Sequence, residues 1–354
     1  MPEPRSDADA RRRARRRHRK PRRRRPAARR LAALLRNTAP RRGPLASRPR
    51  PPVRVPEHAR QRLERLGRGT PEWRSWLRLL EATIAAVNDS AWDTIAPQLD
   101  PARPETAPIL AGAEIAVDRS LGRRWVRRLL EAAAREGGRA AGSLGPAASA
   151  LDPHEFLQVV VGQDTDALTR LAAGAGADPK ALAALGGLAA MPLLQACARR
   201  LADQLPEAWS YGYCPLCGAW PALTEVRGLS PSRRLRCARC GGDWRAEWRS
   251  CVYCGETDHA RLGSLVSDSH GETRKVDTCA ACRGYLKTVT TLAPSPADTV
   301  ALEDLGTVDL DVAALERGYA RPDRPGYIVH ARLVDGRTRL ARAPRWHRVV
   351  RPRP

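Results

Sequence analysis

Eight of the nine cysteines in this 354-residue chain occur as four C-x-x-C pairs within about 70 residues. Two residues between the cysteines let the chain turn so that both sulfur atoms face one ion. A glycine directly after the second cysteine supplies a tight turn, often at positive φ, and three of the four pairs have one. The predicted metal ligands are Cys214, Cys217, Cys237, Cys240, Cys251, Cys254, Cys279 and Cys282.

The spacing of the pairs predicts how they combine. Two pairs supply the four thiolates of a tetrahedral site. The gaps after Cys217, Cys240 and Cys254 are 19, 10 and 24 residues. Because the two longer gaps suit a β-hairpin inside a site, pairing in sequence order predicts two small metal-binding modules, residues 206–247 and 248–321. An interleaved arrangement, first pair with third and second with fourth, is the alternative.

The ligand set also limits the chemistry. We expect two metal ions per chain, either zinc or a rubredoxin-like iron, because a tetrahedron of four thiolates suits both. Such a site keeps no open position for a substrate or a water molecule. The sequence contains no phosphate-binding loop, no H-E-x-x-H and no G-x-S-x-G. We therefore predict a protein that is not an enzyme.

Other residues among the pairs have simpler interpretations. Trp220, Trp244 and Trp248 are expected to pack over the two modules, with a role as a partner-binding anchor as the alternative. His259 and His270 are expected to be exposed loop residues, with hydrogen bonding to the metal ligands as the alternative.

The net charge of +24 is concentrated at the two ends of the chain. Residues 1–54 hold 21 basic and three acidic residues, and residues 322–354 hold nine and two. The part between them has 32 basic and 33 acidic residues, a net charge of −1. A nucleic-acid-binding domain carries its basic patch on the folded surface. We therefore predict a disordered Arg-rich tail (1–54) and a basic C-terminal tail (322–354), with nucleic acid bound only non-specifically through them.

Residues 55–205 have the pattern of an all-α domain of about five helices. Apolar residues recur at three- and four-residue spacing between Trp73 and Val87 and between Leu121 and Leu130. Thr70, Asp152 and Asp178 each precede a proline and are predicted helix N-caps. The last helix is expected to break at Gly186-Gly187 and Pro192. Cys197, inside it, is predicted to be a buried structural cysteine, with a ninth ligand or a reactive thiol as the alternative.

The chain is expected to reside in the cytoplasm and to lack a membrane span. We expect no window of about 18 apolar residues, and therefore no membrane span. Arg29-Arg30 precedes an apolar run of only five residues, too short for an export signal. Cysteines arranged as metal-binding pairs also suit a reducing compartment. After residue 321 only a strand around Tyr327-Ile328-Val329 is predicted.

The cysteine-rich region resembles the FdhE family of formate dehydrogenase accessory proteins. That family shows a W-x-x-G-x-C-P-x-C-G-x-x-P stretch, matched here by Trp209, Gly212, Cys214, Pro215, Cys217, Gly218 and Pro221. Its R-x-L-x-C-x-x-C segment, followed by a tryptophan, an arginine and C-x-x-C-G, is similar to Arg233, Leu235, Cys237, Cys240, Trp244, Arg249, Cys251, Cys254 and Gly255. Its C-x-x-C-x-x-Y-L-K resembles Cys279, Cys282, Tyr285, Leu286 and Lys287.

This resemblance is specific over residues 205–321 and looser over 57–205, and both basic tails depart from the family. It implies an α+β protein, with an all-α N-terminal domain followed by two small rubredoxin-like or zinc-ribbon modules. It implies a cytoplasmic assembly factor that acts on the catalytic subunit of a formate dehydrogenase before any export. A zinc-ribbon nucleic-acid-binding protein and a rubredoxin-like electron carrier are the alternatives.

Overall fold

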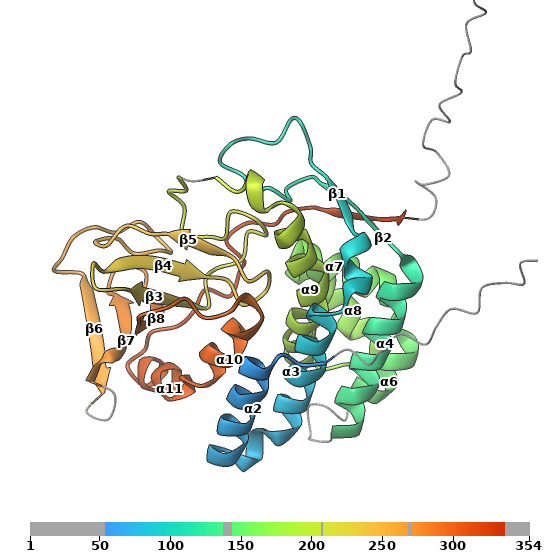
Figure 1. The fold of residues 1–354 in the computed structure, drawn as a ribbon, viewed down its shortest axis with the longest axis horizontal. Helices are drawn as coiled ribbons and strands as arrows, with labels where there is room; N and C mark the ends of the chain where they lie inside the picture. The colour runs from blue at the N-terminus through green and yellow to red at the C-terminus, as the bar shows by residue number, and fades with distance from the viewer. Residues whose placement is uncertain (1–53, 137–143, 207, 268–270, 337–354) are drawn as a thin grey trace, which may run out of the picture. The chain divides into compact units, whose positions relative to one another are not determined.

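The computed structural model describes residues 54–136, 144–206, 208–267 and 271–336 (Figure 1). The predicted Arg-rich tail lies outside the described residues except for Arg54. Residues 337–354 of the predicted C-terminal tail also lie outside them.

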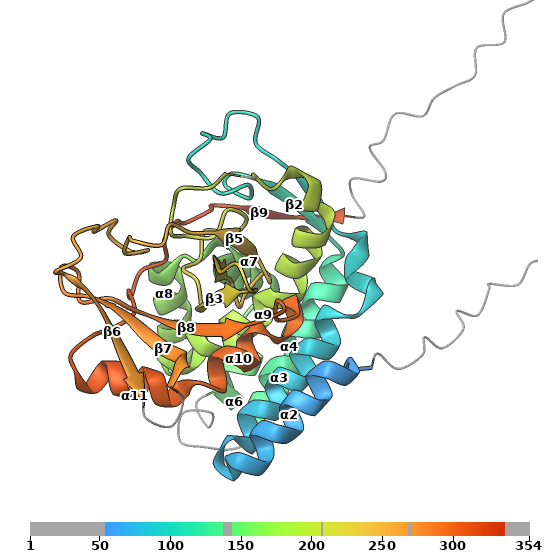
Figure 2. The same cartoon turned by 60° about the vertical axis from the view of Figure 1, so that its left-hand side comes forward.

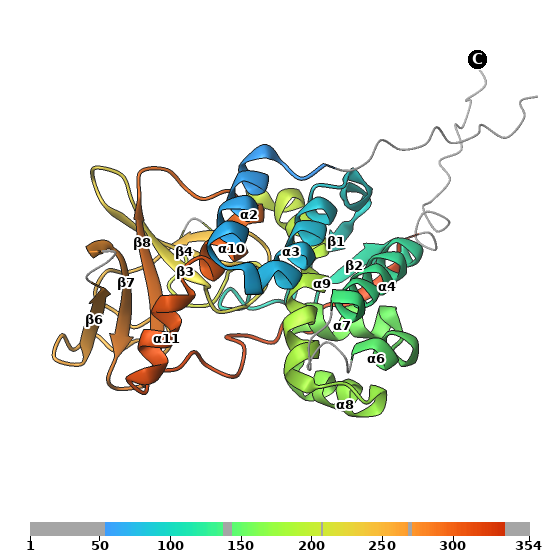
Figure 3. The same cartoon turned by 90° about the horizontal axis from the view of Figure 1, so that it is seen from below.

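Seven α-helices among the described residues form the N-terminal half, more than the five predicted. They are α2 (Glu57–Gly69), α3 (Arg74–Val87), α4 (Arg119–Glu136), α6 (Leu144–Ala150), α7 (Pro153–Gly162), α8 (Thr165–Ala175) and α9 (Pro179–Arg200). α9 packs against α3, α4, α7 and α8. Seen from below, these helices lie together on one side and the strands β3–β8 on the other (Figure 3).

Aspartate side chains begin three of these helices. Asp152, Asp164 and Asp178 each accept a hydrogen bond from a backbone N–H in the first turn, of α7, α8 and α9 respectively. These bonds satisfy donors that have no partner within the helix. The predicted caps at Asp152 and Asp178 are therefore confirmed. Thr70 does not cap a helix, since its hydroxyl donates to the carbonyl of Leu66 at the end of α2.

Helix α9 runs unbroken from Pro179 to Arg200, so the predicted break within it is wrong. A Cβ at Gly186 would lie 2.6 Å from Cγ1 of Val160 in α7. Glycine is needed there because the two helices approach closely, and it does not mark a helix end. Pro192 is buried inside the helix and removes one backbone hydrogen bond. Packing of α9 against four other helices offsets that loss.

α9 also has the length and apolar composition of a membrane span, so the prediction that no such window exists is wrong. In the structure, 72% of this window is buried inside the protein. A helix that is apolar on all sides is also what a protein core requires. Within the described ranges no second helix meets both criteria.

Six strands form one mixed sheet in the order β5-β4-β3-β8-β7-β6. The strands are β3 (Leu223–Arg227), β4 (Ser232–Arg236), β5 (Asp243–Arg245), β6 (Leu262–Ser267), β7 (Gly271–Cys279) and β8 (Tyr285–Thr291). β3–β4–β5 and β6–β7–β8 are each antiparallel, and parallel pairing of β3 with β8 joins them (Figure 2). The two predicted modules are therefore present, but they share a single sheet.

One face of this sheet is covered by α10 (Val300–Leu305) and α11 (Val308–Glu316). Val276 and Tyr285 pack against Leu310 in a small core beneath α11. Beside this core Lys287 is fully buried, and its Nζ lies 2.7 Å from a carboxylate oxygen of both Asp304 and Asp311. These ion pairs join the closing segment of the domain to the sheet.

A second, three-stranded sheet has the order β1 (Ala96–Gln98), β2 (Glu114–Val117), β9 (Arg332–Asp335). The helical half thus carries two short strands that were not predicted. Since β9 pairs in parallel with β2 and Val329 and Ala331 are fully buried, the predicted tail 322–354 begins too early. The strand predicted at 327–329 lies instead at 332–335. Short 3₁₀ helices occupy Pro71–Trp73, Ser90–Thr94, Ala202–Gln204 and Ala297–Thr299.

The helical half and the first cysteine module share one apolar core. Leu216 and Leu235 belong to the same buried cluster as Leu193 and Leu194 of α9. The fold class is α+β, as predicted, and the first module is built onto the helices.

Candidate metal centres

The first cluster consists of Cys214, Cys217, Cys237 and Cys240, whose sulfur atoms all lie within 4.8 Å of one another. The Sγ atoms of Cys214 and Cys240 are 3.4 Å apart, and those of Cys217 and Cys237 are 3.6 Å apart. A disulfide bond is about 2.05 Å long. In a tetrahedron with metal–sulfur bonds of about 2.3 Å, the sulfur atoms are about 3.8 Å apart. The observed spacing suits four ligands of one ion.

The second cluster consists of Cys251, Cys254, Cys279 and Cys282. The Sγ distance is 3.7 Å from Cys251 to Cys282 and 3.8 Å from Cys254 to Cys279. The structure therefore groups the pairs in sequence order and not interleaved. Two tetracysteine clusters that can each hold a metal ion follow from this geometry.

All four cysteine pairs use the same backbone turn. The N–H of the first cysteine donates to the carbonyl oxygen five residues later in each case. The residue four positions after the first cysteine has positive φ. These residues are Gly218, Gly241 and Gly255, with φ between 73° and 75°, and Arg283, with φ 58°. The glycines after three of the pairs thus have the role that the sequence predicted.

Arg283 takes the left-handed conformation without being glycine. Its guanidinium donates to the carbonyls of Arg317 and Gly318 and lies 4.2 Å from the centre of the Tyr319 ring. Its own carbonyl accepts from the N–H of Ala320. These contacts offset the cost of positive φ in a residue with a Cβ. The absence of glycine after Cys282 was the one signal in the sequence.

The two clusters differ in burial. Cys214, Cys217, Cys237 and Cys240 are at most 1% exposed, within the core shared with the helices. In the second cluster Cys279 is buried, whereas Cys254 and Cys282 are exposed. An ion in the first cluster would be shielded from solvent, and an ion in the second would be within reach of solutes.

The buried cluster requires a cation if its sulfurs are to be thiolates. Burial raises the pKa of the Cys214 thiol well above its usual value. Hydrogen bonds from the other three thiols hold the pKa of Cys237 well below its usual value. Hydrogen bonds with Cys214, Cys217 and Cys237 raise the pKa of Cys240 well above its usual value. Burial disfavours several charged sulfurs in one enclosed cluster unless a cation balances their charge. A divalent or trivalent ion removes this restriction because it displaces the protons.

Close contacts link the two clusters. A Cβ at Gly212 would lie 1.7 Å from the carbonyl oxygen of Val252, so only glycine lets these two segments meet. Trp220 packs edge-on against Tyr253, with ring centres 5.1 Å apart. Gly212 precedes the first cysteine pair and Tyr253 lies within the third. These contacts hold the first and third cysteine pairs next to each other.

The remaining predicted residues fall in several environments. Cys197 is fully buried in α9 outside both clusters, and burial raises the pKa of its thiol to about 12. Trp244 is buried as predicted, but Trp248 is 51% exposed. His259 is exposed as predicted, and His270 lies outside the described residues.

Residues 250–325, which include the whole second cluster, match the family model "FdhE, C-terminal domain". The resemblance to the FdhE family is confirmed. "Protein FdhE homolog" of Aquifex aeolicus is 31% identical over 121 residues, which cover 33% of this chain and 42% of that protein. The protein of the same name in Pseudomonas aeruginosa is 32% identical over 121 residues, 32% of this chain and 39% of that one.

The chain thus spans about two fifths of the length of the curated FdhE relatives that it matches. A structural match extends further. The crystal structure of the FdhE protein from Pseudomonas aeruginosa covers 79% of this chain and 97% of its own, with a TM-score of 0.52 and 22% sequence identity. At this identity the match shows the fold alone.

The difference in burial predicts an order of metal release. A chelator is expected to remove the ion of the second cluster first, because Cys254 and Cys282 are exposed. Mixing the metal-loaded protein with a coloured chelator should give a fast and a slow phase of equal amplitude. Cys254→Ser should abolish the fast phase, whereas Cys197→Ala should leave both. Release of both ions in one phase would contradict the assignment.

Proposed function

We propose that the protein binds one metal ion in each cluster and serves as an assembly factor for the catalytic subunit of a formate dehydrogenase. The match of residues 250–325 to the FdhE C-terminal domain carries this proposal. That segment contains all four ligands of the second cluster and the Tyr285-Leu286-Lys287 run of the family. The proposed site of action is the cytoplasm, before any export of the subunit.

The metals would act chiefly through the surface that they hold in place. In each cluster, a tetrahedrally coordinated ion would join the two cysteine turns. The close approach of Gly212 to Val252 holds the two clusters next to each other. A surface that is already ordered loses little conformational entropy when a partner binds. The client would then bind a preformed face and would not have to order it.

The two clusters suit different roles. The first is enclosed in the apolar core, which favours a purely structural ion. The second is open to solvent at Cys254 and Cys282, where an iron ion would exchange an electron with a partner more readily. If the second ion is only structural, zinc-loaded protein should support assembly; if it is redox-active, iron alone should do so. Metal analysis and visible absorption of anaerobically purified protein identify the native ion.

Catalysis of formate oxidation by this chain is not part of the proposal, because eight thiolates in two closed sites keep no position open for a substrate. The comparisons support neither of the two alternatives from the sequence, the nucleic-acid-binding protein and the electron carrier. Client binding, and not electron carriage alone, is what separates the assembly factor from a rubredoxin.

Deletion of the gene in its host is expected to abolish formate dehydrogenase activity while transcription of the catalytic subunit continues. The tagged protein should recover that subunit from an extract. Complementation with Cys251→Ser should fail because the second cluster loses a ligand. Complementation with Cys197→Ala should succeed, since Cys197 belongs to neither cluster.

Normal formate dehydrogenase activity in the deletion strain, with no subunit recovered by the tagged protein, would overturn the proposed function. The metal-binding assignment would survive that result, because it rests on the cluster geometry and is tested separately by metal content.

A further inference from the structure

The six-stranded sheet is a tandem repeat of one unit. Each unit consists of a cysteine pair, a hairpin, a second cysteine pair and a third strand that pairs with the second strand of the hairpin. In the first unit the hairpin begins with β3, and in the second it begins with β6. β3 and β6 are therefore equivalent strands.

The outer edges of these equivalent strands differ in what covers them. The edge of β3 that faces away from β4 pairs with β8, in parallel. The corresponding edge of β6, facing away from β7, has no strand beside it within the described part of the chain. The repeat thus shows which kind of neighbour such an edge accepts: an extended segment, parallel to the first strand of the hairpin.

β6 lacks the usual protection of an edge strand. Natural edge strands carry lysines, prolines or other charges that prevent pairing with foreign segments. The β6 sequence, Leu262–Ser267, contains no charged residue and no proline. Its Val266 side chain is 53% exposed, and only an irregularity between Val266 and Ser267 interrupts the register. An exposed edge of this kind is a template for strand addition.

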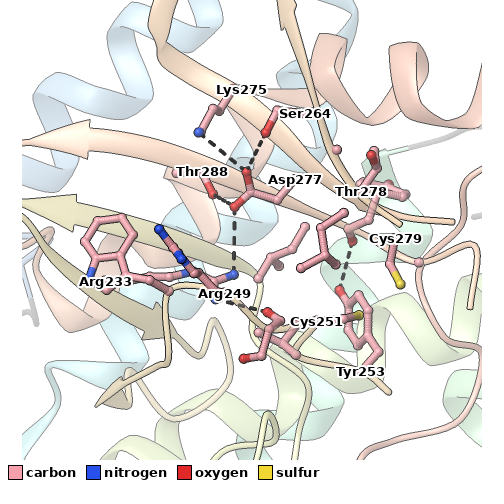
Figure 4. Close-up of a pocket in the computed structure, with 18 of the residues that line it drawn as sticks. Arg233, Arg249, Cys251, Tyr253, Ser264, Lys275, Asp277, Thr278, Cys279 and Thr288 are labelled. Carbon is pink, nitrogen blue, oxygen red and sulfur yellow. Dashed lines mark hydrogen bonds and ion pairs between the residues drawn. The ribbon is translucent and has the colours of Figure 1, made fainter. Parts of the chain in front are cut away.

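A cavity of about 510 Å³ adjoins this edge, on the sheet face opposite α11. Ser264 of β6, Lys275 and Asp277 of β7 and Thr288 of β8 line it. Asp277 is held by ion pairs to Arg233 and Lys275 and by the hydroxyls of Ser264 and Thr288 (Figure 4). The floor of the cavity is therefore an ordered polar network.

The cavity has an excess of positive charge. Arg233, Arg249 and Lys275 line it against the single carboxylate of Asp277. Arg233 is only 6% exposed, whereas Arg249 is exposed and makes no hydrogen bond or ion pair with any described residue. Figure 4 shows the Arg233 and Arg249 side chains side by side, across the cavity from Tyr253 and Cys279. Guanidinium pairs of this kind bind carboxylates.

Resting on the proposed function, we propose that the outer edge of β6 accepts an extended, acidic segment of the client protein. Its backbone pairs with β6 as β8 pairs with β3, and its carboxylate side chains enter the cavity towards Arg249 and Lys275. The ends of this chain are unsuitable occupants because both are cationic. Residues 1–53 carry 20 basic and three acidic residues, and residues 337–354 carry seven arginines and no acid.

The test uses the full-length, metal-loaded protein and the purified catalytic subunit of the host's formate dehydrogenase. Arg249→Glu combined with Lys275→Glu is expected to weaken binding at least about tenfold, because both charges that meet the segment are reversed. Arg274→Glu is the matched control, since its side chain alternates to the opposite face of β7 and does not line the cavity. Metal content and melting temperature confirm that each variant is folded.

Hydrogen exchange of the backbone supplies a second measurement, which non-specific electrostatic attraction between the two proteins would not change. Binding of the subunit is expected to slow exchange in the peptide covering 262–267, because the free N–H groups of β6 become paired. Peptides from α4 should be unaffected.

Three results would overturn the inference. Equal affinity of the charge-reversed and wild-type proteins would do so, as would unchanged exchange in β6 when the subunit is bound; the proposed function would stand in both cases. Displacement of the subunit by inorganic phosphate, with β6 exchange unaffected, would identify a small-anion site instead. Failure of the wild-type protein to bind the subunit would overturn the proposed function itself.

Discussion

Cys214→Ser is expected to be the most damaging single substitution in the chain. Cys214 is fully buried, and its sulfur lies within 4.8 Å of the other three sulfurs of the first cluster. The apparent binding free energy of a structural zinc ion is on the order of 10–16 kcal/mol, and it is mostly folding free energy. Loss of one ligand should therefore lower the free energy of unfolding by more than about 5 kcal/mol and the melting temperature by more than about 10 °C.

Two matched variants distinguish the stability contributed by a bound metal ion from that contributed by a buried cysteine side chain. Cys251→Ser removes a ligand from the second, solvent-exposed cluster. Its effect on the free energy of unfolding should be smaller and confined to the second module. Cys197→Ala removes a buried thiol outside both clusters and should cost about 1–2 kcal/mol. Thermal unfolding followed by circular dichroism, with metal content measured on the same samples, checks all three. A Cys214→Ser protein that keeps two ions and the wild-type melting temperature would refute the first cluster.

Lys287→Met is expected to lower the free energy of unfolding by about 3–5 kcal/mol, because it leaves two carboxylates beside a buried apolar side chain. Lys287 is fully buried and pairs with both Asp304 and Asp311 at 2.7 Å. Among the described residues, Arg321 is then the one cation left in an ion pair with those two carboxylates. Urea unfolding measures the difference. Lys275→Met, on the opposite face of the same sheet and half-buried, should cost less than about 1 kcal/mol.

The destabilisation caused by Lys287→Met should depend on pH. Although burial acts to raise the pKa of Asp304, the charges of Arg321 and Lys287 outweigh it, and the net shift is downward. A carboxyl with a lowered pKa in the folded state stabilises the protein above its unfolded pKa, and that stability is lost as the pH falls. The difference in the free energy of unfolding between Lys287→Met and the wild type should therefore become smaller below about pH 4. A difference that stays constant from pH 7 to pH 3 would contradict the ion-pair explanation.

The features that were predicted from the sequence depend on neighbours close in the chain. A C-x-x-C turn places both sulfurs with the help of one or two adjacent residues, so four pairs and their spacing were enough to group the cysteines. Asp152 and Asp178 cap their helices through N–H groups two or three residues away. The apolar stripe of α4 follows from the period of the helix alone.

The features that were missed depend on residues far apart in the sequence. In the sequence Gly186 has the pattern of a helix breaker, and its close contact with Val160 becomes visible only in the structure. β9 exists because residues 332–335 pair with residues 114–117, more than 200 positions earlier. The parallel contact of β3 with β8, which turns two modules into one sheet, likewise has no local signal. The cationic cavity follows from that sheet and was therefore also missed.

The tandem arrangement of the two units also bears on how copies of this chain could associate. Joining through β3 and β8 is head to tail, so the two ends of the sheet are not equivalent: one is β6 and the other is β5. Contacts between unlike ends do not form a symmetric pair; they form a ring where the rotation closes and a fibre where it does not. β5 is only three residues long, and such a short strand offers little backbone to a neighbour. The brevity of β5 thus keeps β6 available for a different protein without promoting polymerisation.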